Sequence, residues 1–139
     1  MKKAVISIKG WQFLSGMTDS NCIEFVTDGD YSMSDGVGEI SYAESELTGY
    51  DGCNTVFQVM KDHILLKRDG AVSSEMIFDP ARKHNFVYDT PVGSLLFGLS
   101  TQKIINDLDE NGGRLEIKYA LDIDSRVISN NSFEINVKS

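Results

Sequence analysis

The sequence has few cysteines, and their placement limits the chemistry it can support. Cys22 and Cys53 are the two cysteines, with no CxxC motif and no second pair at metal-ligand spacing. This pattern favours two reduced thiols, as in cytosolic proteins, over a disulfide or a thiol nucleophile.

Basic residues are also scarce, and long apolar runs are missing. There are 13 Lys and Arg against 21 Asp and Glu, a net charge of -8, and no run of Lys or Arg. Such a surface repels phosphate backbones and anionic lipid, so we expect no nucleic-acid partner. No stretch approaches the ~18 apolar residues of a membrane helix. The start, "MKKAVISIKGWQ", is interrupted by Ser7 and Lys9, which is typical of a strand rather than a signal peptide. We therefore expect a soluble, cytoplasmic protein.

Prolines are few, and nothing in the chain resembles a linker, a low-complexity segment or a solenoid repeat. Hydrophobic residues make up 41% of the chain and charged residues 24%, values typical of a folded globular protein. At 139 residues the chain is long enough to bury one sizeable core. We therefore predict a single domain over residues 1–139.

What the sequence does have is alternation with a period of two. In "GRLEIKYALDID" (113–124) the odd-numbered positions from 115 to 123 are apolar, and most positions between them are charged. "SFEINVK" (132–138) repeats this scheme, and Ala4, Ile6 and Ile8 indicate the same for the first strand. Turn-forming clusters such as "SDG", "RDG" and "DENGG" separate the runs. We expect about ten strands, at roughly 2–11, 22–30, 37–46, 54–60, 63–69, 74–79, 84–89, 94–105, 114–124 and 127–138.

These strands predict an all-β fold. Helical spacing of Ile104, Ile105 and Leu108 leaves room for one short helical turn in "TQKIINDLDENGG", ending at Gly112. About ten short antiparallel strands must stack as a sandwich or close as an up-and-down barrel. We favour the barrel, because an even number of strands lets the first and last pair and would remove both edges.

Three segments resemble the successive motifs of one known family. "YAESELTGYDGCNT", "LKRDGAVSSEMIF" and "YDTPVG" are similar to motifs of the YwiB-like bacterial proteins, a domain of unknown function with a calycin-like, lipocalin-related β-barrel. The resemblance implies this fold and a cytoplasmic bacterial origin, and it brings no known reaction. Most matching positions are glycines, turn formers or core aromatics, so they indicate architecture more than chemistry: Tyr42, Glu44, Leu47, Gly49, Gly52, Thr55, Arg68, Gly70, Phe78, Tyr88, Thr90, Pro91 and Gly93.

Strand parity predicts a buried ion pair between Glu44 and Arg68. Glu44 shares the parity of Ile40 and Tyr42, and Arg68 that of Leu66, so both should point inward at the same end of the barrel. The two strands are separated by two inter-strand steps of ~4.8 Å, a distance that the Glu44 and Arg68 side chains can close between them. A buried carboxylate needs a partner, and a guanidinium can offer two parallel hydrogen bonds. The pair either closes the barrel end or lets Arg68 anchor a ligand carboxylate or phosphate.

Aromatic residues gather around the same end. Trp11 and Tyr88 are expected at strand ends beside it, with Tyr42 and Tyr119 on the barrel wall. Such aromatics suit the entrance of an apolar pocket and equally suit a plugged end. The candidate ligand-binding residues are Arg68, Glu44, Tyr42, Tyr88, Tyr119 and Trp11.

The sequence offers little support for catalysis or a metal. Glu44 and Glu46 would lie about 6.5–7 Å apart, the spacing of an inverting hydrolase pair, but any Glu-x-Glu on a strand gives it. We expect Glu46 and Asp51 to be solvated. Cys53 and His84 are predicted at opposite ends of the barrel. Aspartates are scattered and do not follow the ligand order of a calcium loop. We therefore predict no catalytic residue, no metal ligand and no cofactor.

Two functional hypotheses remain from different classes. The first is a calycin-like barrel that binds a small, partly apolar molecule, with an anionic group as one option. The alternative is a barrel packed with its own side chains that serves as a protein-interaction or assembly module, either monomer or homodimer. Enzyme activity ranks third. The interior volume separates the first two, because a ligand site needs at least ~300 Å³.

Overall fold

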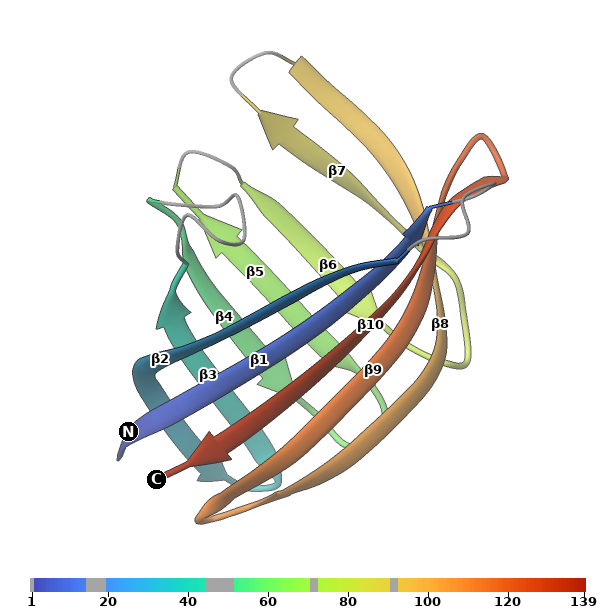
Figure 1. Ribbon diagram of the computed structural model, residues 1–139. Helices are drawn as coiled ribbons and strands as arrows, with labels where there is room; N and C mark the ends of the chain where they lie inside the picture. The colour runs from blue at the N-terminus through green and yellow to red at the C-terminus, as the bar shows by residue number, and fades with distance from the viewer. Residues whose placement is uncertain (1, 15–19, 45–51, 71–72, 91–92) are drawn as a thin grey trace.

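Ten antiparallel strands form one sheet, which confirms the all-β prediction (Figure 1). The computed structural model describes residues 2–14, 20–44, 52–70, 73–90 and 93–139, and no helix that could span a membrane occurs among them. The strands are β1 (Lys2–Leu14), β2 (Ser20–Ser34), β3 (Val37–Ala43), β4 (Asn54–Val59), β5 (Ile64–Asp69), β6 (Ser74–Phe78), β7 (His84–Thr90), β8 (Gly93–Asp109), β9 (Gly112–Ile123) and β10 (Arg126–Lys138).

The sheet curls into a nearly closed barrel. Consecutive strands pair from β1 through to β6 and again from β7 through to β10, and β1 pairs with β10 in the register Ile6↔Val137. Pairing of the first and last strands is therefore confirmed, and it places the two chain ends side by side (Figure 1).

The prediction that this pairing removes both edges is wrong, because the sheet ends at β6 and β7. In the described part of the chain no ladder joins β6 to β7, and the Asp79 amide that follows β6 donates a hydrogen bond to Thr101 Oγ1 of β8 at 3.0 Å. In Figure 1 the β7–β8 hairpin rises away from the β5–β6 hairpin. The barrel thus has a seam between β6 and β7.

Burial follows the predicted alternation and places the core inside the barrel. Ile40, Tyr42 and Glu44 are buried, while Val5, which blurs the alternation of β1, is 42% exposed. Rings and branched aliphatic side chains from every strand except β7 are fully buried inside the barrel. The largest fully buried side chains are Tyr31, Phe57, Phe78, Ile6, Ile40, Ile64, Leu66, Leu99, Leu115, Ile117, Ile135 and Val59.

The segment that could have held a helical turn is a strand. β8 runs without a break to Asp109, and its register with β9 shifts between Thr101 and Lys103. Before this one-residue bulge the odd-numbered side chains of β8, such as Leu99, point inward. After it the even-numbered ones do, so Ile104 and Leu108 pack against the core. The prediction of a helical turn is therefore wrong, because a shifted strand parity imitates helical spacing.

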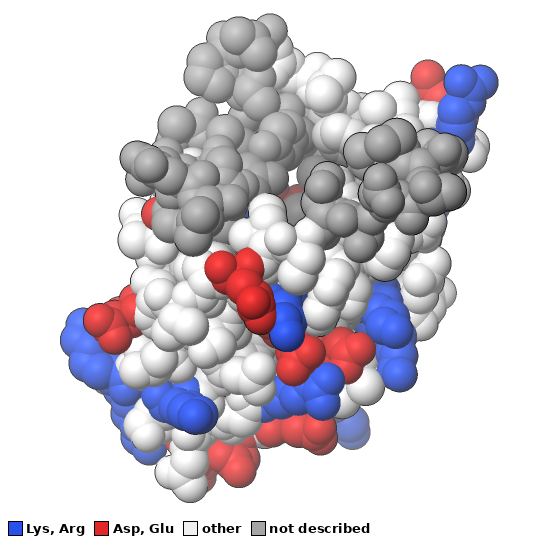
Figure 2. All heavy atoms as spheres, in the orientation of Figure 1, with Lys and Arg blue, Asp and Glu red and all other residues white. Residues whose placement is uncertain are grey.

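The outer face of β1, β2, β9 and β10 carries charges of both signs. Lys9 Nζ lies 3.0 Å from Glu24, and Arg114 lies 3.0 Å from Glu116 and 3.3 Å from Glu134. Figure 2 shows red and blue side chains next to one another over this face. Exposed pairs of this kind contribute little to stability and leave no concentrated patch of one sign there.

Candidate ligand-binding pocket

A cavity of about 350 Å³ lies inside the barrel near the end where Arg68 is placed. Five of the six candidate residues line it, and they come from β1, β3, β5 and β9 and from the residue that follows β3: Trp11, Tyr42, Glu44, Arg68 and Tyr119. The structure thus brings together residues that are up to 108 positions apart in the chain (119 minus 11). Tyr88 belongs to β7, but its side chain lies outside the described residues, as do Glu46 and Asp51.

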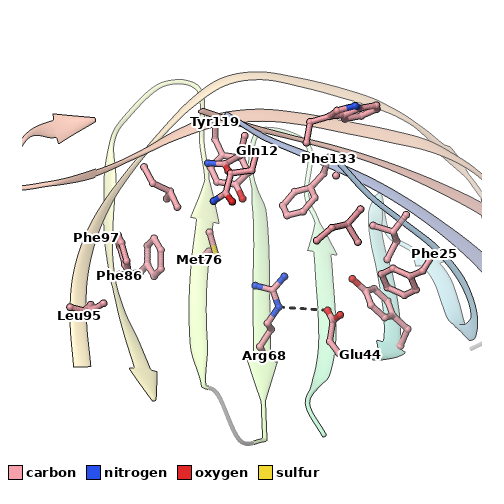
Figure 3. Close-up of a pocket in the computed structure, with 17 residues that line it drawn as sticks. Gln12, Phe25, Glu44, Arg68, Met76, Phe86, Leu95, Phe97, Tyr119 and Phe133 are labelled. Atoms are coloured by element: carbon pink, nitrogen blue, oxygen red, sulfur yellow. Dashed lines mark ion pairs between the residues drawn. The ribbon is translucent and has the colours of Figure 1, made fainter. Parts of the chain in front are cut away.

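The predicted ion pair between Glu44 and Arg68 is confirmed. Arg68 Nε lies 3.6 Å from Glu44 Oε1, and the two side chains are 9% and 1% exposed. The distance is that of an ion pair and is longer than the hydrogen bonds of the predicted guanidinium fork. Figure 3 shows the pair on one wall of the pocket, with the terminal nitrogens of Arg68 turned away from Glu44 toward the cavity.

Strand register explains why these two side chains meet. Thr55 of β4 is paired with Tyr42 on one side and with Arg68 on the other, so the three residues form one row across β3, β4 and β5. Thr55 Oγ1 donates a 2.6 Å hydrogen bond to Glu44 Oε1, and the Glu44 amide donates one of 2.9 Å to the Cys53 carbonyl. The carboxylate is therefore fixed by its backbone, by a hydroxyl and by a cation.

The Tyr42 phenol adds a neutral polar group to this cluster. Burial raises the pKa of the Tyr42 hydroxyl well above its usual value, the Glu44 carboxylate raises it further, and the Arg68 guanidinium opposes this. The phenol therefore stays protonated at neutral pH. One buried cation, one buried anion and a neutral hydroxyl together form the buried polar cluster of the pocket.

Six aromatic rings in three contacting pairs line the cavity. Phe86 and Phe97 stack with ring centroids 5.4 Å apart, and Tyr119 and Phe133 lie at 5.6 Å. On the other side Phe25 meets Tyr42 edge to face, at 5.9 Å. All these rings line the cavity, together with Met76 of β6. The pocket is thus a polar cluster surrounded by aromatic surface.

Several of these lining residues were missed as site residues by the sequence analysis. Phe133 was predicted to face inward, but parity alone does not separate a side chain that fills the core from one that borders a cavity. Phe25 and Phe97 lie on strands whose alternation is weak, so their inward orientation had no clear signal. Gln12 and Asn131 add amide groups to the lining and carried no signal either.

Trp11 lies at the rim rather than deep inside. It shares the outward parity of Lys9, whose Nζ lies 5.7 Å from the centre of the Trp11 ring. Leu95 and Ile23 also line the cavity, although they are 53% and 41% exposed. These exposed lining residues mark where the pocket opens, so the expectation of Trp11 at the mouth agrees with the structure.

The arrangement offers no grouped metal ligands within the described ranges, where no three His, Cys, Asp or Glu side chains come together. Cys22 and Cys53 form no disulfide. His84 starts β7, beside Asp79 at the end of the barrel opposite Arg68, whereas Cys53 contacts Glu44. The predicted separation of Cys53 and His84 is therefore confirmed.

Comparisons with known proteins give consistent matches. A family model described as a domain of unknown function (DUF1934) matches residues 6–135, a range that contains all six candidate residues. The uncharacterized beta-barrel protein YwiB of Bacillus subtilis (strain 168) is 32% identical over 101 residues, which are 73% of this chain and 70% of that protein. The crystal structure of ywiB protein from Bacillus subtilis matches with a TM-score of 0.85 at 25% identity, covering 99% of this chain and 91% of that one.

Proposed function

The chain belongs to the family described as a domain of unknown function (DUF1934), and from this premise we propose that it binds a small, partly apolar molecule inside its barrel. Arg68 anchors an anionic group of the ligand, and the aromatic walls hold its apolar body. The proposal includes a calycin-like mode of binding and a cytoplasmic location. The location is supported by the two cysteines, which form no disulfide with each other.

The observation that carries the proposal is a buried guanidinium on the wall of a largely apolar, ring-rich cavity. A charge in such surroundings costs free energy, and sealing the barrel end with apolar side chains would avoid that cost. Placed beside a cavity of about 350 Å³, the same charge can recognise a ligand, because pockets combine apolar walls with a few fixed polar groups.

The alternative hypothesis, a barrel packed with its own side chains, has less support. A filled interior would leave no ligand-sized space, whereas this cavity exceeds the ~300 Å³ lower limit of small-molecule sites. The rigid environment of Glu44 also favours a binding role. The Glu44 carboxylate accepts a hydrogen bond from Thr55, and the Glu44 amide donates one to the Cys53 carbonyl, so the carboxylate holds Arg68 in place for an incoming anion.

The test is a titration with 1-anilinonaphthalene-8-sulfonate, an aromatic anion whose fluorescence rises in apolar surroundings. Replacing Arg68 alone would strand the Glu44 carboxylate, so the variant is the neutral pair Glu44→Gln/Arg68→Met. We expect the wild type to bind the probe and the double variant to bind at least about 10-fold more weakly, since a charge-assisted contact is lost.

Arg114→Met is the matched control, because Arg114 lies on the outer face and pairs with Glu116 and Glu134. Its probe affinity should equal that of the wild type. Thermal unfolding of all three proteins shows that they are folded. Equal affinity in the wild type and the double variant, together with no small molecule retained in native mass spectrometry of protein purified from its host, would rule the proposal out.

A further inference from the structure

We propose that the ligand is a planar aromatic anion rather than a flexible aliphatic one, an inference that rests on the proposed function and names the class of molecule it binds. The shape and rigidity of the apolar walls carry this inference, whereas Arg68 carries the preference for an anion.

The walls are built from aromatic pairs on three sides of the cavity. The β7–β8 hairpin supplies Phe86 and Phe97, whose planes are 22° apart, and β9 and β10 supply Tyr119 and Phe133, whose planes are 34° apart. Figure 3 shows Arg68 and Met76 on the barrel wall between these two pairs and opposite Tyr119. A flat ring system entering the cavity therefore meets aromatic surface on more than one side.

These walls are ordered before any ligand arrives. Tyr119 also contacts Phe78 edge to face at 4.9 Å, and Phe78 is fully buried. Tyr42 lies against Phe57, another fully buried ring, at 6.5 Å. The Tyr119–Phe133 and Phe25–Tyr42 pairs are thus each supported by a fully buried core ring, so their orientation is held by packing, whereas Phe86 and Phe97 stack on each other.

A rigid wall of rings discriminates between ligand classes for two reasons. Offset-stacked and edge-to-face contacts between rings add to the free energy of apolar burial, and an alkyl chain does not form them. An alkyl chain also loses conformational entropy at each bond that the pocket immobilises, whereas a fused ring has no such bonds to freeze. Both effects favour a planar aromatic acid over an aliphatic acid of similar size.

The experiment is isothermal titration calorimetry with 2-naphthoate and with decanoate, two monocarboxylates with nearly the same number of heavy atoms. We expect the wild-type protein to bind 2-naphthoate about 10-fold more tightly than decanoate. Phe97→Leu, which keeps an apolar side chain but removes one ring, should weaken 2-naphthoate binding several-fold and leave decanoate binding unchanged. Unchanged decanoate binding also shows that the variant is folded.

Phe133→Leu repeats the test on the opposite wall, and Phe13→Leu is the control. Phe13 is 46% exposed and does not line the cavity, so its replacement should change neither affinity. Equal wild-type affinity for both acids, or an equal loss of both in Phe97→Leu and Phe133→Leu, would overturn the inference while leaving the proposed function in place. If neither acid binds, the proposed function fails, and the inference fails with it.

Discussion

Removal of one partner from the Glu44–Arg68 pair should destabilise the protein far more than removal of an exposed charge. At the observed Nε to Oε1 distance of 3.6 Å, Coulomb's law with an effective dielectric constant of ~20 gives an attraction of about 4 to 5 kcal/mol. Glu44→Gln leaves a buried guanidinium without its counter-charge. We therefore expect it to lower the free energy of unfolding by about 3 kcal/mol or more.

The assay is a double-mutant cycle by guanidinium chloride unfolding, with Glu44→Gln, Arg68→Met and the double variant. The double variant removes both charges, so it should be more stable than the sum of the single changes predicts, by about 3 kcal/mol. The matched cycle uses Lys9 and Glu24, whose atoms are closer, at 3.0 Å, but whose side chains are 44% and 64% exposed.

Burial rather than distance should decide the outcome, so the coupling free energy for Lys9 and Glu24 should be far smaller than that for Glu44 and Arg68. Equal coupling free energies in the two cycles would contradict this expectation, as would a Glu44→Gln variant that unfolds at the wild-type denaturant concentration. Either result would mean that water reaches the pair and screens it.

Two further predictions concern Tyr42 and the close approach of strands. The pKa of Tyr42 is raised in the folded state, so the unfolded chain loses the phenol proton first as the pH rises above about 10. The free energy of unfolding should therefore be constant with respect to this group below that pH and fall by up to ~1.4 kcal/mol per pH unit above it. Tyr42→Phe should make this decline shallower. The measurement is the free energy of unfolding of the variant and the wild type, by denaturant, between about pH 9 and about pH 11. If the two free energies fall in parallel with pH, the prediction is wrong. Gly29→Ala should cost about 2 kcal/mol or more, because a Cβ atom there would collide with Ile6 Cδ1 and the Ser41 carbonyl oxygen. Gly10→Ala, whose Cβ would meet its nearest atom at 3.5 Å, should be nearly neutral, and equal Tm losses in the two variants would show that crowding is not the cause.

Much of the fold could be predicted because the period-two pattern is strong where one face of a strand is buried. In β9, Leu115, Ile117 and Tyr119 are all buried, as their parity requires. The pattern fails where the strand itself is irregular: the bulge after Thr101 shifts the parity of β8, and no rule of alternation gives its position. The seam between β6 and β7 was also unpredictable, because alternation shows which face of a strand is buried and not which neighbouring strands pair.

The polar part of the candidate site was predictable, and its apolar part was not. Glu44 and Arg68 are charged residues at inward positions, so the free-energy cost of burial forces them to pair, and strand order gives the partner. A phenylalanine on an inward position satisfies the fold equally well in a packed core and beside a cavity. Whether Phe86 and Phe97 border empty space depends on the curvature of the whole sheet, which short-range sequence patterns do not encode.

The pairing of β1 with β10 has a consequence for how the chain reaches its native state. Strands β1 to β6 form one continuous meander and β7 to β10 another, and in the described part of the chain the β1–β10 ladder is the strand pairing that joins them. During synthesis β1 leaves the ribosome early, but its ladder partner is made after every other strand. The pairing of Val5 with Lys138 therefore closes one of the longest loops in the chain, and contacts of such high sequence separation slow folding. Until residues 126–138 emerge, β1 can pair only with β2, and its other edge is open to a chaperone or a neighbouring nascent chain.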